Sequence, residues 1–321
     1  MIGRIEGFRV GHWTDVEAGT GCTAILPPQG AVAAVDVGGG GTSARETDLL
    51  APTSSVRMLS ALVFTGGSAF GLDAASGVVR WCEERGLGRD TGAATVPLVS
   101  AAVIYDLGIT AGRRRPGAEE GYAACVAAAD GAHAVGSVGA GTGATVGKLL
   151  GQAGWCKGGL GAAAVTTHDG AAVAALAVVN CWGDVVDDDG SVLAGAWRDG
   201  SFVGAARRAW SDPPEHPRLA ADGQNTTLVC VATDAALSGA EADRVARMAH
   251  TGLARAVHPV NTPIDGDAAF CLASGRVTAA PFAVGAAAAW VSAEAVRDAV
   301  RSAEPVRGVP TAEMRLAGRS G

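Results

Sequence analysis

The peptide bond between Asn225 and Thr226, where a polar turn meets an apolar β-branched run, is the point in the sequence that most clearly suggests a chemical reaction. A threonine hydroxyl is a poor nucleophile by itself. If the bond before Thr226 is cut, however, a new α-amino group appears on the same residue, and its reference pKa of about 7.7–8.0 lets it act as the base for that hydroxyl at neutral pH. The bond therefore marks either the plain start of a strand or a self-cleavage site that exposes an N-terminal nucleophile.

The segment upstream of this bond, residues 206–225, has the composition of an exposed loop. It contains three prolines and several charges and has no apolar period. A loop that ends at the bond to be cut, followed by a buried strand that holds the nucleophile, is the arrangement that self-cleavage needs. Asn225-Thr226-Thr227 also fits an N-glycosylation sequon, but the N-terminus MIGRIEGFRVGHWTD lacks the basic and apolar regions of a signal peptide.

A glycine-rich segment, GSVGAGTGATVGKLLG at 136–151, fails the tests for a nucleotide site. Thr142 replaces the first glycine of a P-loop, and Leu149 replaces its Mg²⁺-binding hydroxyl residue. The dinucleotide fingerprint also lacks its acidic residue about 20 positions later. The segment is either a tight loop packed against other backbone or a loop that places Lys148 in a site, and no cofactor is expected.

Other motifs are open to simple structural interpretations. The glycines of GGGGT at 38–42 permit positive φ or close backbone approach, and TGGSAFGLDA at 65–74 is either an anion-binding helix start or only a turn. DDDGS at 187–191 lacks the alternating spacing of an EF-hand loop and is interpreted as a hairpin tip. His250 and His258 have no third ligand nearby in the sequence, so no metal is expected.

Composition limits the class of protein. The chain has 321 residues, of which 48% are hydrophobic, enough for one large or two ordinary domains with a sizeable core. Its net charge of −7 without a basic stripe argues against nucleic acid as a partner, and no apolar run reaches the ~18 residues of a membrane span. The seven cysteines are widely spaced without a C-x-x-C, which is typical of reduced core thiols and predicts a cytoplasmic protein.

The elements that must position the chemical groups alternate between strands and helices. Continuous apolar runs, which suit strands covered on both faces, occur at 31–37, 61–65, 171–180 and 227–233. Helices are predicted at 68–86, 117–131, 238–258 and 292–304. The third begins with a capping box formed by Ser238 and Glu241. This mixture predicts a layered α/β or α+β domain.

Eight blocks of the sequence, in order along nearly the whole chain, resemble the L-aminopeptidase/D-amidase-esterase (DmpA-like) family. This family includes β-aminopeptidases and the 6-aminohexanoate-oligomer (nylon oligomer) hydrolase. The blocks are FRVGHWTDVEAGTGCTAIL (8–26), GGGGTSARETDLL (38–50), LVFTGGSAFGLDAASGV (62–78), VPLVSAAVIYDL (96–107), GSVGAGTGATVGK (136–148), VVNCWGDVVD (178–187), NTTLVCVATDAAL (225–237) and NTPIDGDAAF (261–270).

The resemblance implies a fold and an activity. The expected fold is α+β, an αββα four-layer sandwich of the N-terminal-nucleophile-hydrolase type, formed by residues 1–321 as a single domain. The expected activity is amide or peptide hydrolysis after self-cleavage into chains 1–225 and 226–321, which stay associated. No cofactor is implied. The expected partners are a small peptide or amide substrate and further copies of the chain, in a homotetramer or larger.

The resemblance also implies the site residues. Thr226 corresponds to the nucleophile freed by cleavage after Asn225, and Tyr105 matches a site tyrosine. The lysine, the asparagine and the pair of aspartates of the nylon-oligomer hydrolase site correspond to Lys148, Asn180, Asp265 and Asp267. Aminopeptidases of the family with a serine nucleophile carry Ser-x-Glu where this chain has Asp-x-Asp. The chain therefore looks closer to the nylon-oligomer branch.

Each of these residues has a suitable chemical role and a simpler alternative. Asn180 could donate to an oxyanion, or it is a turn asparagine. Lys148 could pair with Asp265 and Asp267, which would compensate a buried charge, or it is a solvated lysine. Asp265 and Asp267 are otherwise part of an ordinary turn around Gly266. Tyr105 could donate to the oxyanion or to a substrate carbonyl, or it is a core tyrosine. The rival function is a glycine-rich binding protein of the same fold that is never cut and has no enzymatic activity.

Overall fold

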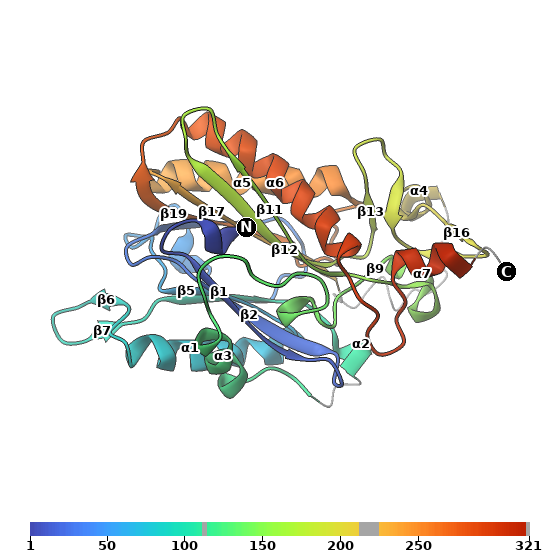
Figure 1. Cartoon of the computed structure of the whole chain (residues 1–321), viewed down its shortest axis with the longest axis horizontal. Coiled ribbons are helices and arrows are strands. Elements are labelled where there is room, and N and C mark those ends of the chain that lie inside the picture. Colours follow the sequence, from blue (N-terminus) through green and yellow to red (C-terminus); the bar gives the residue numbers. More distant parts are fainter. Residues whose placement is uncertain (111–113, 212–224, 319–321) are drawn as a thin grey trace.

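Figure 1 shows the computed structural model as four layers, with two β-sheets packed face to face between two pairs of helices. The structure describes residues 1–110, 114–211 and 225–318. This is the αββα sandwich that the family resemblance implies.

The first five-stranded sheet carries the predicted nucleophile. Its order is β11-β12-β17-β19-β3, and its neighbours are antiparallel except for the parallel pair β17 and β19. The strands are β3 (Val32–Val37), β11 (Gly159–Thr166), β12 (Ala172–Asn180), β17 (Thr226–Ala235) and β19 (Ala268–Val277).

The second five-stranded sheet has the order β1-β2-β5-β8-β4, with β5 and β8 parallel. Its strands are β1 (Arg9–Asp15), β2 (Thr20–Leu26), β4 (Ala44–Arg45), β5 (Ala61–Thr65) and β8 (Val99–Val103).

Two pairs of helices cover the outer faces. Helices α5 (Gly239–Ala256) and α6 (Pro281–Arg301) pack on the first sheet, and α1 (Ala74–Glu83) and α3 (Ala118–Val126) pack on the second. The shorter helical elements are η1 (Ile2–Arg4), η2 (Asp48–Leu50), η3 (Ser68–Asp73), α2 (Leu107–Thr110), η4 (Gly139–Gly141), η5 (Lys148–Leu150), η6 (Gln152–Gly154), α4 (Ala205–Ser211) and α7 (Ala312–Ala317). The short strands are β6 (Arg89–Asp90), β7 (Thr95–Val96), β9 (Thr145–Val146), β10 (Cys156–Lys157), β13 (Asp184–Val186), β14 (Val192–Ala194), β15 (Trp197–Arg198), β16 (Ser201–Phe202) and β18 (Val257–His258).

The side chains of β17 alternate between two parts of the core. Leu228 and Cys230 point between the sheets, whereas Val229 packs against the helical layer. Because strand side chains alternate with a period of two, Thr226 belongs to the face between the sheets and Thr227 to the helix face. The predicted nucleophile therefore lies at one end of the space enclosed by the two sheets.

Most of the predicted elements are confirmed, with small shifts at their ends. The apolar runs form β3, β5, β12 and β17, and the capping box of Ser238 and Glu241 begins α5. The 187–191 segment is the predicted hairpin tip, where the N–H of Asp187 donates to the Ser191 carbonyl at 2.8 Å.

Two predicted boundaries are wrong. Helix α6 begins at Pro281 rather than at Ser292, because proline suits the first turn of a helix and the alanine-rich run after it continues the helix. The predicted loop at 206–225 begins as helix α4, which ends at Ser211. Its proline-containing part, residues 212–224, lies outside the described residues.

The cysteines are buried and reduced, as predicted. Burial raises the pKa of the Cys181 and Cys230 thiols well above the ordinary value, which leaves them protonated and unreactive. Within the described ranges, no helix is long and apolar enough to cross a membrane. No group of three potential metal-ligating side chains is found in the same part of the chain.

Candidate active site

Thr226 is the first residue of β17, and its direct partner across the sheet is Asn180, the last residue of β12. Both lie on the face between the sheets, so their side chains are neighbours at the same edge. Thr226 is only 5% exposed. The antiparallel register thus brings together two residues that are 46 positions apart by the difference of their residue numbers.

The carbonyl oxygen of Asn225 has two donors. The Thr226 hydroxyl donates to it over 2.5 Å, and the backbone N–H of Gly266 donates to it over 2.7 Å. An isolated parallel bridge between Asn225 and Asp265 places the two segments side by side. The carbonyl that self-cleavage would attack is therefore polarised by a backbone N–H and lies next to the proposed nucleophile.

Asp267 holds the backbone on the other side of Thr226. Its Oδ1 accepts the N–H of Thr227 at 2.5 Å, and its Oδ2 accepts the N–H of Asn261 at 2.9 Å. Burial, with a further effect from the neighbouring Asp265 carboxylate, raises the pKa of Asp267 to about 6. Its carboxylate form thus serves as a fixed acceptor for two backbone donors above that pH.

Asp265 is tied to the turn that precedes it. Its Oδ2 accepts from both the hydroxyl and the N–H of Thr262. Burial raises the pKa of Asp265, while the hydrogen bond from Thr262 and the positive charge of Lys148 act in the opposite direction. The two aspartates therefore lie on either side of Gly266, and each is held by its own set of donors.

The glycine-rich segment at 38–42 packs against the turn that contains Asp265 and Asp267 and donates hydrogen bonds to it. The N–H groups of Gly38 and Gly39 donate to the carbonyl of Asp267 at 3.0 and 3.1 Å, and that of Gly41 donates to the carbonyl of Asp265 at 2.8 Å. A Cβ on Gly39 would lie 2.2 Å from the Asp265 carbonyl oxygen. Close backbone approach is thus the reason for glycine at this position.

Lys148 lies in the buried short helix η5 and is 4% exposed. Its Nζ donates to the backbone oxygen of Asn180 at 3.0 Å and to the side-chain Oδ1 of Asn180 at 2.9 Å. Burial lowers the pKa of Lys148 to about 7, although nearby acidic groups, including Asp265, favour its charged form. The glycine-rich segment is a tight loop packed against other backbone, since a Cβ on Gly141 would lie 2.3 Å from the Leu160 nitrogen, and the same loop holds Lys148 in this buried polar cluster.

Asn180 connects the two sheets. Its Oδ1 also accepts the N–H of Thr145 at 3.0 Å, and its Nδ2 donates to the backbone carbonyl of Tyr105 at 3.2 Å. Tyr105 follows β8 of the second sheet and therefore approaches the site from the opposite side. The contact between Tyr105 and Asn180 uses the backbone oxygen of the tyrosine, whereas the sequence suggested a role for its hydroxyl.

Asp106 is a site-proximal residue that the sequence interpretation did not single out. Its carboxylate accepts the Thr20 hydroxyl at 2.6 Å and the Gly67 N–H at 2.8 Å. Burial raises the pKa of Asp106 to about 6. Gly67, the turn glycine of the 65–74 motif, thus donates to a protein carboxylate. The sequence feature that could have pointed to Asp106 was its position directly after Tyr105.

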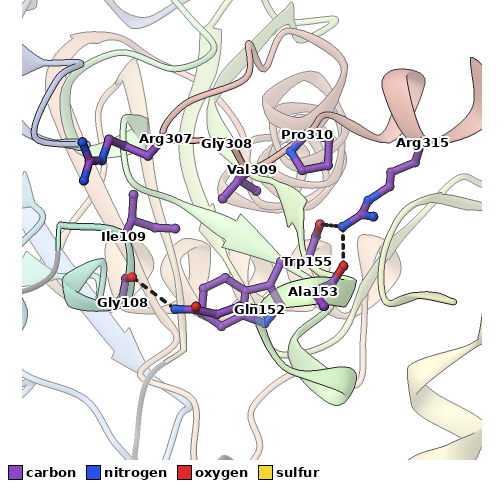
Figure 2. Close-up of a pocket in the computed structure, with 10 residues that line it drawn as sticks. All are labelled: Gly108, Ile109, Gln152, Ala153, Trp155, Arg307, Gly308, Val309, Pro310 and Arg315. Carbon is purple, nitrogen blue, oxygen red and sulfur yellow. Dashed lines mark hydrogen bonds between the residues drawn. The ribbon is translucent and has the colours of Figure 1, made fainter. Parts of the chain in front are cut away.

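A separate pocket of about 600 Å³ lies beside this polar site and is shown in Figure 2. Trp155 lines it, and Lys148 Nζ lies 5.8 Å from the centroid of the same indole ring. Arg315 closes one side by donating to the carbonyls of Ala153 and Trp155 at 2.6 and 2.9 Å, and Arg307 lies across the pocket. None of the predicted catalytic residues lines this pocket.

The arrangement of the layers is that of an N-terminal-nucleophile-type hydrolase. The structure of an L-aminopeptidase/D-Ala-esterase/amidase from Ochrobactrum anthropi, described as a variant of that fold, matches with a TM-score of 0.72 at 22% identity. The match covers 99% of this chain and 92% of that one. A Burkholderia sp. β-aminopeptidase gives the same TM-score, identity and coverage. At this identity the similarity establishes the fold alone.

The sequence establishes the family. Residues 1–314 match peptidase family S58, and the chain belongs to it. An uncharacterized aminopeptidase of Mycobacterium tuberculosis is 43% identical, with 96% of this chain and 95% of the relative covered. A 6-aminohexanoate-oligomer endohydrolase of Paenarthrobacter ureafaciens is 31% identical, with 91% and 84% covered. The protein is therefore a hydrolase of peptide or amide bonds.

Proposed function

We propose that the protein is made as a single precursor, cuts itself between Asn225 and Thr226, and then uses Thr226 as the N-terminal nucleophile of an amide hydrolase. The observation that carries this proposal is the pair of contacts on the Asn225 carbonyl oxygen, from the Thr226 hydroxyl at 2.5 Å and from the Gly266 N–H at 2.7 Å. A nucleophile and a preorganised donor at one buried carbonyl are the two requirements of acyl transfer.

Self-cleavage begins with attack of Thr226 Oγ1 on the carbonyl carbon of Asn225. The carbonyl electrons move onto oxygen, where the Gly266 N–H stabilises the charge, and the hydroxyl proton passes to the nitrogen of Thr226. The C–N bond then breaks, which leaves an ester between the Asn225 acyl group and Thr226 Oγ1. Water hydrolyses this ester and releases chains 1–225 and 226–321, with a free α-amino group on Thr226.

In the mature enzyme the same oxygen attacks the carbonyl of a substrate. The α-amino group of Thr226 accepts the hydroxyl proton and returns it to the departing amine, which leaves an acyl ester on Thr226. Water cleaves this ester, giving a carboxylic acid and the free hydroxyl. Asn180 supports the reaction from the neighbouring strand β12, where Lys148 of η5 donates to both of its oxygens and fixes its position.

The charges around Thr226 are compensated within the site. Lys148 carries the positive charge, and Asp265 and Asp267 carry the negative charges that favour its protonated form. A buried cation without such neighbours would be costly. We propose that the new α-amino group of Thr226 joins this set beside Asp265, whose segment pairs with Asn225 in the precursor.

Two substrate classes follow from the relatives, and a specific observation favours each. The aminopeptidase name belongs to the relative at 43% identity, and the threonine with Asp-x-Asp follows the nylon-oligomer pattern. A panel of peptides and linear amide oligomers with free and blocked N-termini separates them. Complete loss of hydrolysis on blocking supports the aminopeptidase, and unchanged hydrolysis supports cleavage inside oligomers.

Self-cleavage is tested on a denaturing gel combined with N-terminal sequencing. Two bands are expected, the smaller one beginning at Thr226. Thr226→Ala should remain a single inactive chain, and Thr226→Ser, which keeps a hydroxyl, should still be cut. A persistent full-length wild-type band would favour the rival function, a binding protein without enzymatic activity. Light scattering under native conditions tests the homotetramer or larger oligomer that we also propose.

A further inference from the structure

A chain of polar contacts leads away from Asp267 on the helix side of the first sheet. The Oδ2 of Asp267 accepts the backbone N–H of Asn261 at 2.9 Å. The side-chain Oδ1 of Asn261 lies 2.6 Å from Nε2 of His250, and Nδ1 of His250 lies 2.9 Å from Oδ2 of Asp36. The nucleophile's supporting carboxylate is thus connected to a histidine on α5.

Asn261 has a backbone conformation that must be held in place. Its φ is +55°, in the left-handed region that costs a non-glycine residue roughly 1–2 kcal/mol. Asparagine enters this region more readily than most residues, because its side chain can form local hydrogen bonds. Here the side-chain oxygen is engaged by His250, so that contact fixes the peptide whose N–H reaches Asp267.

The space around this contact is closed. A Cβ on Gly38 would lie 2.4 Å from Cε1 of His250 and 2.6 Å from Oδ1 of Asn261. His250 itself is 4% exposed. The imidazole is therefore closely packed, with Nε2 in hydrogen-bond contact with Asn261, whereas Nδ1 lies near Asp36 without hydrogen-bond geometry.

We infer that His250 is a positioning residue for the Thr226 site, acting through Asn261 and Asp267. His250 Nε2–H donates to Asn261, which holds the Asn261 N–H on one oxygen of Asp267. The other oxygen of Asp267 accepts the N–H of Thr227, the residue directly after the nucleophile. This inference rests on the proposed function of Thr226, because the position that it fixes is that of the nucleophile.

Two substitutions test the roles of the two ring nitrogens of His250 separately. In His250→Gln the amide nitrogen approximates the position of Nε2 and keeps a donor for Asn261. In His250→Asn the shorter amide approximates Nδ1 and loses that donor. Self-cleavage is followed on denaturing gels after cell-free synthesis, with the exposed His168→Asn as control. We expect His250→Asn to cut about tenfold more slowly, the effect of one hydrogen bond of about 1.4 kcal/mol, and the other two variants to remain within about threefold of wild type.

A second background tests the route of the effect. Glycine adopts a positive φ without a side-chain contact, so in Asn261→Gly the additional change His250→Asn should slow cleavage no further. Activity of the fully cut enzymes gives an independent readout, in which His250→Asn lowers kcat and leaves KM unchanged. Melting temperatures in the Thr226→Ala background identify any variant that merely fails to fold.

The outcomes distinguish this inference from the proposed function. A wild-type chain that never cuts at Thr226 overturns both. A wild-type chain that cuts, together with a folded His250→Asn variant that cuts equally fast, overturns the positioning role and leaves the nucleophile in place. An equal slowing in the Asn261→Gly background shows that His250 acts by some route other than Asn261, and also overturns the inference.

Discussion

Replacing Gly266 by alanine places a methyl group against the reacting atoms. The Cβ would lie 2.6 Å from Thr226 Oγ1, 3.2 Å from the Gly41 carbonyl oxygen and 3.3 Å from Thr42 Cα. The first distance is shorter than any ordinary contact, and the other two neighbours are backbone atoms. Either the Thr226 hydroxyl turns away from the Asn225 carbonyl, or the Gly266 N–H moves away from it.

The size of the effect follows from the donor that is disturbed. The Gly266 N–H lies 2.7 Å from the Asn225 oxygen on which charge would develop in the proposed self-cleavage. Removing one such donor typically costs a factor of about 10²–10³ in rate, or roughly 2.7–4 kcal/mol of transition-state stabilisation. We therefore predict that Gly266→Ala slows self-cleavage by at least about 10²-fold.

The assay is a time course of the full-length band on denaturing gels after cell-free synthesis. Gly318→Ala is the matched control, because a Cβ there meets nothing within 4 Å. Melting of the uncut Gly266→Ala chain, with Thr226 kept in place, checks that the fold is intact. A correctly folded Gly266→Ala chain that cuts within about threefold of wild type would refute the assignment of Gly266 as the donor.

Three further changes test the buried polar groups. Lys157 Nζ donates to three backbone carbonyls, so Lys157→Met should lower the free energy of unfolding by about 2–4 kcal/mol. Calorimetry of the Thr226→Ala precursor should show a melting temperature about 3–6 °C lower. Asp106→Asn should become more stable relative to its parent as pH rises from about 4 to 7. Folding raises the pKa of Asp106 from 3.8 to about 6. The free energy of unfolding of the parent therefore falls by about 3 kcal/mol as pH rises from below 3.8 to above about 6, which denaturant titrations measure. Lys148→Met should slow self-cleavage on gels by about 10–100-fold, because both oxygens of Asn180 lose a charged donor.

The sequence predicted the framework because the signals for the framework are local. Continuous apolar runs produced β12 and β17, and the capping box of Ser238 and Glu241 marked the start of α5. The start of α6 was predicted wrongly at Ser292, since a serine followed by an acidic residue can also stand inside a helix. Pro281, eleven positions earlier by residue number, is the residue that begins it.

The composition of the site depends on contacts that no local pattern contains. Asn180 meets Thr226 through the register of two strands, and Lys148 reaches Asn180 from a loop that is distant in sequence. The family resemblance proposed these residues together, and in the structure Lys148 donates to Asn180, the cross-strand partner of Thr226. The donor role of Gly266 was not predicted, because a backbone N–H has no side-chain signature and a glycine between two aspartates is typical of any turn.

The two reactions proposed for Thr226 pass through intermediates of the same kind, an acyl ester on Oγ1. If Gly266 stabilises the oxyanion in both, a change at Gly266 should slow both. The ester formed from Asn225 in the precursor has the same Thr226 Oγ1–acyl bond as the ester formed later from a substrate. If the substrate carbonyl occupies the position that the Asn225 carbonyl leaves, the same N–H stabilises both oxyanions. Gly266→Ala enzyme that has been allowed to cut to completion should therefore lose about the same factor in kcat as it loses in self-cleavage. Steady-state kinetics of that enzyme and of Gly318→Ala measure this. A cut Gly266→Ala enzyme with undiminished kcat would show that the substrate carbonyl lies elsewhere, because a donor to both oxyanions should affect both acyl transfers.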